Sequence, residues 1–66
     1  MYAVVQMTGQ QISSVTLHTT RGEAVRQAMR LTDRRDARQF LRDLKNRGYV
    51  ILGTKRYHVV PISKPA

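Results

Sequence analysis

The stretch from Glu23 to Arg47 contains neither Gly nor Pro, yet its apolar residues cannot all face one side of a single helix. At about 100° per residue, the apolar side chains of residues 24–31 centre near ~50° from Ala24, whereas those of residues 37–44 centre near ~210°. A continuous helix would bury one group and expose the other. The sequence therefore predicts two helices, residues 21–31 and 33–47, that meet at a tight corner.

Local signals mark the ends of both predicted helices. Residues 20–23, Thr-Arg-Gly-Glu, match a capping box, in which the Thr hydroxyl accepts from the amide three residues on and the Glu carboxylate accepts from the cap amide. Thr32 and Asp33 are the candidate caps of the second helix, because their side-chain oxygens can accept from its first amides. Gly48 is the predicted stop, since glycine adopts the left-handed conformation most easily.

Four short segments outside the helical region favour β-structure. Tyr2–Met7 and Ile12–Thr19 are rich in β-branched residues and flank a Thr-Gly-Gln turn, so they predict a first hairpin. Tyr49–Leu52 and Tyr57–Ile62 flank a turn with a basic tip and predict a second hairpin. The expected fold is α+β with the order ββααββ, in which two short helices joined by a tight turn pack on an antiparallel sheet of two hairpins.

The size of the chain limits it to a single domain over residues 1–66, of which residues 63–66 are expected to form a frayed tail. A domain this small hides only about 60% of the surface of its unfolded chain. The absence of cysteine removes disulfides as a means of support, which leaves a homodimer as an open alternative. Neither a bilayer-spanning run of ~18 apolar residues nor a secretion signal is present, so a cytoplasmic protein without a membrane partner is expected.

Net charge is +8, and it is distributed unevenly along the chain. Residues 1–20 carry no Lys, Arg, Asp or Glu, whereas residues 21–47 carry nine basic and four acidic residues, a net of +5. Five arginines follow one another at a spacing of four residues. Like charges repel at that spacing on a helix, so this arginine series destabilises the helices unless an anion lies against it. A polyanion partner, nucleic acid above all, is favoured over a merely solvated helix surface. The series consists of Arg26, Arg30, Arg34, Arg38 and Arg42.

Little in the chain favours catalysis, a metal or a cofactor. His18 and His58 lie far apart with no cysteine near them, and neither of the glycine motifs that cradle phosphate is present. One enzymatic alternative is a metal-independent toxin ribonuclease that uses Arg56, Tyr57 and His58. Strand alternation sends Tyr57 to the opposite face from the other two. We therefore predict that the protein is not an enzyme and has no cofactor or metal.

Residues 37–51, followed by a basic hairpin that ends in Tyr-His-Val-Val, resemble the recognition helix and wing of winged helix-turn-helix proteins. In that family a helix with paired leucines ends at Asn/Arg-Gly, and a strand begins directly after it. The resemblance covers roughly residues 20–62. It departs from the family at the N-terminus, where a hairpin stands in place of the usual helix and replaces it as a sheet layer.

The resemblance implies a small phage-type transcription regulator or architectural accessory that binds double-stranded DNA. Its second helix would enter the major groove, and its hairpin would lie along the backbone or minor groove. Thr32 would donate to a phosphate, and the arginines suit guanine edges or phosphates because the guanidinium can donate two bonds. The implied nucleic-acid site consists of Thr32, Arg34, Arg35, Arg38, Arg42, Lys45, Lys55 and Arg56.

The remaining charged and aromatic residues have structural interpretations. Asp33 is expected to cap the second helix, and Asp36 to interact with its dipole. Asp43 precedes Arg47 by four residues and is expected to pair with it. Tyr49 and Tyr57 are interpreted as a cross-strand pair on the core, with base stacking as the alternative.

Two other partners stay open: structured RNA on the same basic face, or an acidic protein surface if the chain is a small inhibitor of the kind that phages encode.

Overall fold

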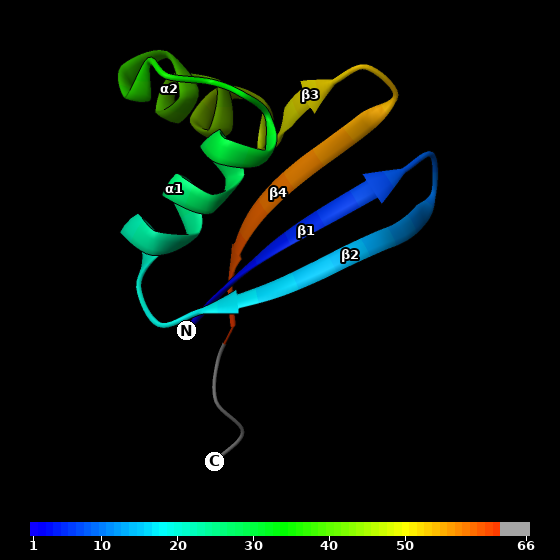
Figure 1. Ribbon diagram of the computed structural model, residues 1–66, viewed down its shortest axis with the longest axis horizontal. Helices are drawn as coiled ribbons and strands as arrows, with labels where there is room; N and C mark the ends of the chain where they lie inside the picture. Colours follow the sequence, from blue (N-terminus) through cyan, green and yellow to red (C-terminus); the bar gives the residue numbers. More distant parts are fainter. Residues whose placement is uncertain (63–66) are drawn as a thin grey trace.

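The computed structural model describes residues 1–62, and the tail expected at residues 63–66 lies outside them. Two helices lie on one side of a four-stranded antiparallel sheet whose strand order is β2-β1-β4-β3 (Figure 1). The predicted ββααββ order and α+β class are therefore confirmed. The elements are β1 (Tyr2–Thr8), β2 (Gln11–His18), α1 (Arg21–Leu31), α2 (Ala37–Arg47), β3 (Val50–Leu52) and β4 (Lys55–Pro61).

The two hairpins join into one sheet because β1 pairs with β4 along its whole length, from Tyr2 opposite Pro61 to Thr8 opposite Lys55. Residues that pair directly in an antiparallel sheet share one face. Val4, its partner Val59 and the Val50–Tyr57 pair thus face the helices. Alternation along each strand sends the neighbours of these residues to the other face.

A β-bulge at Ser13 changes the phase of β2. Gln6 pairs with Ser14 but Met7 pairs with Ile12, so β2 has one extra residue at this point. Without the bulge, alternation would place Ile12 opposite in direction to Val15 and Leu17. With it, all three side chains point away from the helices.

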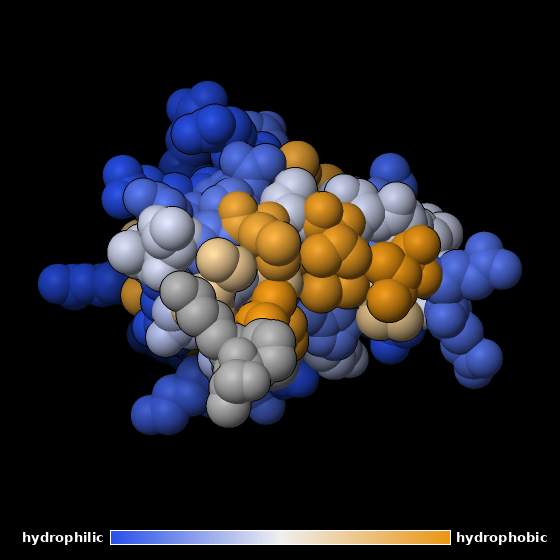
Figure 2. All heavy atoms as spheres, turned by 90° about the horizontal axis from the view of Figure 1, so that it is seen from below, coloured by the Kyte–Doolittle hydropathy of each residue, from blue (hydrophilic) through white to orange (hydrophobic). Residues whose placement is uncertain are grey.

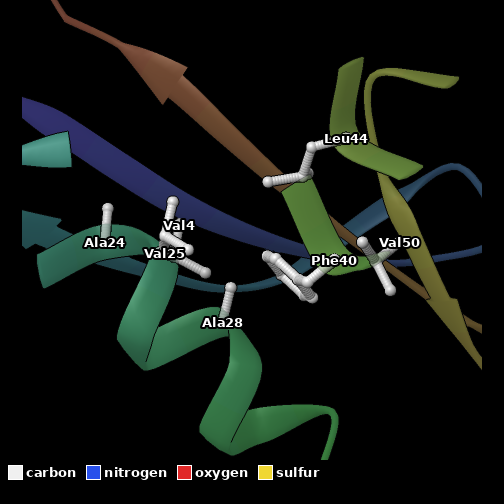
Figure 3. Close-up of a cluster of buried hydrophobic side chains, with 7 residues drawn as sticks. All are labelled: Val4, Ala24, Val25, Ala28, Phe40, Leu44 and Val50. Atoms are coloured by element: carbon white, nitrogen blue, oxygen red, sulfur yellow. The ribbon is translucent and has the colours of Figure 1, made fainter. Parts of the chain in front are cut away.

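The core lies between the helices and the sheet (Figure 3). Phe40, Val4 and Val50 are its largest fully buried side chains. Ala24 and Ala28 of α1 are completely buried, and their small size lets the helix approach the strands closely. Phe40 of α2 reaches into the same cluster, so both apolar stripes share one core. Neither helix is long and apolar enough to span a bilayer within the described part of the chain.

The corner between the helices is a Schellman motif, which differs from the predicted arrangement. The Arg34 amide donates to the Met29 carbonyl at 2.9 Å and the Asp33 amide donates to the Arg30 carbonyl at 3.2 Å. This geometry requires a left-handed residue, and Asp33 supplies it with φ 53°. The predicted start of the second helix at residue 33 is wrong, because these bonds belong to the end of α1 and α2 begins at Ala37.

The caps of the two helices follow the same type of chemistry at partly different residues. Thr20 caps α1 as predicted and accepts from the Glu23 amide at 3.2 Å. The other half of the predicted capping box differs, because the Glu23 carboxylate accepts from the Thr19 hydroxyl and not from the Thr20 amide. Asp36 caps α2 and accepts from two backbone amides, those of Arg38 and Gln39. The expectation that Thr32 or Asp33 would cap α2 is wrong, because both residues terminate α1.

Replacement of Asp33 by glycine is expected to stabilise the fold. A left-handed conformation costs an L-residue roughly 1–2 kcal/mol, and an acid at a helix C-terminus also opposes the helix dipole. Asp33→Gly should therefore raise the free energy of unfolding by about 1 kcal/mol, measured by urea denaturation. Gly48→Ala is the matched opposite change at φ 83° and should lower it by a similar amount. A lower midpoint for Asp33→Gly would contradict the strain.

Candidate nucleic-acid interface

One face of α2 presents a row of basic side chains to solvent. Phe40 and Leu44 define the buried stripe of this helix. Arg38, Arg42 and Lys45 are spaced four and three residues apart, lie roughly opposite that stripe and are exposed. The structure therefore brings three of the predicted site residues together on one surface.

The acidic residues nearest to this row are occupied elsewhere. The Asp36 carboxylate accepts from backbone amides at the start of α2. Asp43 forms a half-buried ion pair with Arg34, in which Nη1 and Oδ2 are 3.0 Å apart. The expected pairing of Asp43 with Arg47 is wrong, because the corner brings Arg34 back over α2. The outer row consequently has no carboxylate beside it on α2, while Arg34 has a structural partner.

Thr32 has no donor left for a phosphate. Its side chain is 3% exposed, its hydroxyl donates to the Ala28 carbonyl at 2.8 Å, and its amide donates to the same carbonyl at 3.0 Å. The expectation that Thr32 would donate to a phosphate from a helix N-terminus is wrong, because Thr32 lies at the C-terminal end of α1. Arg35 is exposed in the connection just before α2.

The two basic residues at the tip of the second hairpin point to opposite faces of the sheet. Lys55 alternates with Tyr57 and lies on the helix side, where it is exposed. Arg56 lies on the other side, donates from Nη2 to the Gly9 carbonyl, and places its guanidinium carbon 5.8 Å from the centre of the Tyr49 ring. Arg56 thus links the turns of the two hairpins and does not join Lys55 in one patch.

The aromatic residues divide between the two faces as well. Tyr57 is 4% exposed on the helix side. Tyr49 lies beside His58 on the opposite face, with ring centres 5.3 Å apart and planes tilted by 40°. The expected Tyr49–Tyr57 pair is therefore wrong, because Val50 is the residue opposite Tyr57. Arg56, Tyr57 and His58 do not meet on one surface as the ribonuclease alternative requires.

Tertiary packing adds basic residues that the sequence pattern did not place near the row. Arg21 at the start of α1 and Lys45 near the end of α2 line one hollow. A shallow groove between α1 and the end of β2 is lined by His18, Arg26 and Arg30, together with Glu23 and Gln27. Arg21 is far from Lys45 along the chain, so only the fold, which places both residues at one hollow, could bring them together.

No group of three His, Cys, Asp or Glu residues gathers as a metal site within residues 1–62. Comparison with protein-family models finds no match, and comparisons with curated proteins and with solved structures find none either. The function of the site must therefore be inferred from its geometry. It is an exposed basic helix face whose neighbouring carboxylates bond to other groups.

His58 makes the stability of the fold depend on pH. Burial, and then the nearby Arg56 charge, lower the pKa of His58 from 6.5, and its Nε2 atom is inaccessible and has no hydrogen-bond partner among the described residues. The unfolded chain binds more protons than the folded chain between that lowered pKa and 6.5. The stabilising contribution of neutral His58 is thus fully present above the unfolded value and is lost as the pH falls through the folded one.

Urea denaturation at about pH 7 and pH 5.5 tests this dependence, since the carboxylates stay ionised across that window. The midpoint should fall at the lower pH in the unmodified protein. His58→Gln should flatten the difference, whereas His18→Gln should keep it because His58 remains. A full pH dependence in His58→Gln would contradict the assignment.

Proposed function

We propose that this protein binds double-stranded DNA through the outer face of α2, as a small transcription regulator or architectural accessory. The observation that carries the proposal is the exposed row of Arg38, Arg42 and Lys45, which has no acid beside it on the helix. Repulsion within the row is relieved when phosphates lie against it. The net charge of +8 supports a polyanionic partner in general, and the row gives that charge a defined position.

The shape of the helical layer favours a duplex with an accessible major groove. An α-helix with its side chains is about 10–12 Å across, close to the ~12 Å width of the major groove of B-form DNA. The deep, narrow major groove of A-form RNA does not admit a helix in this way. α2 lies at a corner of the molecule, away from the first hairpin (Figure 1), so its outer side is free to approach a groove.

Neighbouring basic residues extend the contact beyond the row. Arg35 precedes the N-terminus of α2, Arg21 and Lys45 line one hollow near its other end, and Lys55 is exposed on the same side of the sheet. These residues suit phosphates that flank the groove, whereas the arginine forks of the row suit guanine edges. Arg34, Arg56 and Thr32 serve the fold in this proposal.

Removal of one arginine from the row tests the proposal. Arg38→Ala should weaken binding to a selected duplex by about 1–3 kcal/mol, and it should reduce the preference for that duplex over one in which the contacted guanine is replaced. Fluorescence anisotropy with a duplex chosen by selection from random DNA, at salt concentrations around 100 mM, measures both quantities.

Arg26→Ala is the matched control, because it removes the same charge from an exposed position on α1 outside the row. It should cost clearly less than Arg38→Ala. Equal losses would mean diffuse charge attraction and would reject α2 as the docking helix. Preference for a matched RNA duplex, or failure to bind any duplex near 100 mM salt, would reject DNA as the partner.

A further inference from the structure

Within residues 1–62, no helix or strand covers the side of the sheet that faces away from the helices, and this side is largely apolar. Ten large hydrophobic side chains are exposed within residues 1–62. Seven of the ten lie on this side by strand register and alternation, and three of the seven are on β2. We call this surface the open sheet face. Its exposed apolar residues are Met1, Ile12, Val15, Leu17, Ile51, Val60 and Ile62.

The exposure of these residues is high where β2 contributes to the face. Ile12 is 63% exposed, Val15 51% and Leu17 60%. The bulge at Ser13 is what turns Ile12 to this side, so the irregularity of the strand extends the apolar surface. Figure 2, which views the molecule from below Figure 1, shows hydrophobic side chains gathered in a band between hydrophilic ends.

Charge indicates which partner this face can receive. The chain has a net charge of +8, so two copies repel each other wherever their basic surfaces approach. The strands β1 and β2 carry no Lys, Arg, Asp or Glu. Arg56, at the edge of the face, is already bonded to the Gly9 carbonyl and lies against Tyr49. Within residues 1–62, two copies can therefore meet on the open sheet face without opposing free lysine or arginine side chains.

The size of the face is suited to a small dimer interface. Three strands of seven or eight residues and one of three residues, about 4.8 Å apart, form a plane of roughly 400 Å². Side chains protrude from this plane, so its accessible area is larger than its projected area. A stable interface buries ~800 Å² per partner. Within residues 1–62 the largest fully buried side chains are Phe40, Val4 and Val50, so additional burial at a dimer interface would stabilise this small core.

We propose that the open sheet face is the interface of a homodimer, in which the sheets of two copies pack face to face about a two-fold axis. The same surface serves both copies, as a two-fold interface requires. The sheets would stack about 10 Å apart, and the helical layers would lie on opposite outer sides. The proposal needs no nucleic acid, so it stands or fails separately from DNA binding.

Sedimentation equilibrium over a wide range of protein concentration tests the interface in the absence of nucleic acid. The unmodified protein should have twice the 7.6 kDa mass of the chain. Leu17→Lys should give the single-chain mass, because it places a charge within the apolar contact. Leu17 is exposed in the single chain, so circular dichroism of the variant should remain native. Ile12→Lys provides a second variant with the same expected result if Leu17→Lys fails to fold.

Leu31→Lys is the matched control, since Leu31 is 39% exposed at the end of α1, outside the open sheet face. It adds the same charge and should leave the dimer intact. A single-chain mass for the unmodified protein at all concentrations would overturn the proposal and leave the face to a different partner. Equal dissociation by Leu31→Lys and Leu17→Lys would overturn it as well, because general charge repulsion would then explain both.

Hydrogen exchange separates face packing from pairing of two β2 edges. In a face-packed dimer the β2 amides that point away from β1 stay open to solvent and exchange rapidly. In an edge-paired dimer these amides bond to the partner strand and become protected. Protection of the outward β2 amides in the dimer would therefore overturn face-to-face packing.

Discussion

Two apolar stripes that point in different directions must meet in one core, and the corner between α1 and α2 is what makes this possible. The left-handed Asp33 ends α1 and turns the chain. Phe40 can then enter the space above the buried alanines of α1, beside Val4 and Val50 (Figure 3). The ion pair of Arg34 with Asp43 closes the same corner from outside. The sheet, the helices and the free basic row all depend on this turn.

The fold could largely be predicted from the sequence, because the signals that specify it are local. Apolar phase separates the helices, and Thr20 and Gly48 mark two of their ends. The sequence did not predict that Asp36, and not Thr32 or Asp33, caps α2. All three residues can cap a helix, and the hydrogen bonds that terminate α1 decide between them.

The site was harder to predict from the sequence than the fold, because the residues that contact its side chains come from different elements. Spacing alone suggests that Asp43 pairs with Arg47, but the corner places Arg34 closer to it. Alternation separates Lys55 from Arg56, and the pairing of β1 with β4 gives Arg56 the Gly9 carbonyl. The fold also places Arg21 and Lys45 around one hollow. Long-range contacts thus sort the basic residues into those that hold the fold and those that remain free.

The position of β1 between β2 and β4 has a consequence for folding during synthesis. β1 and β2 emerge first from the ribosome, yet the second neighbour of β1 is β4, which ends at Pro61. The central strand therefore keeps one open edge until nearly all of the described chain has been made. Such non-local pairing slows folding and leaves an uncharged hairpin exposed to aggregation meanwhile. Slow translation of residues 19–54 would prolong that vulnerable state, whereas rapid completion of β4 would end it.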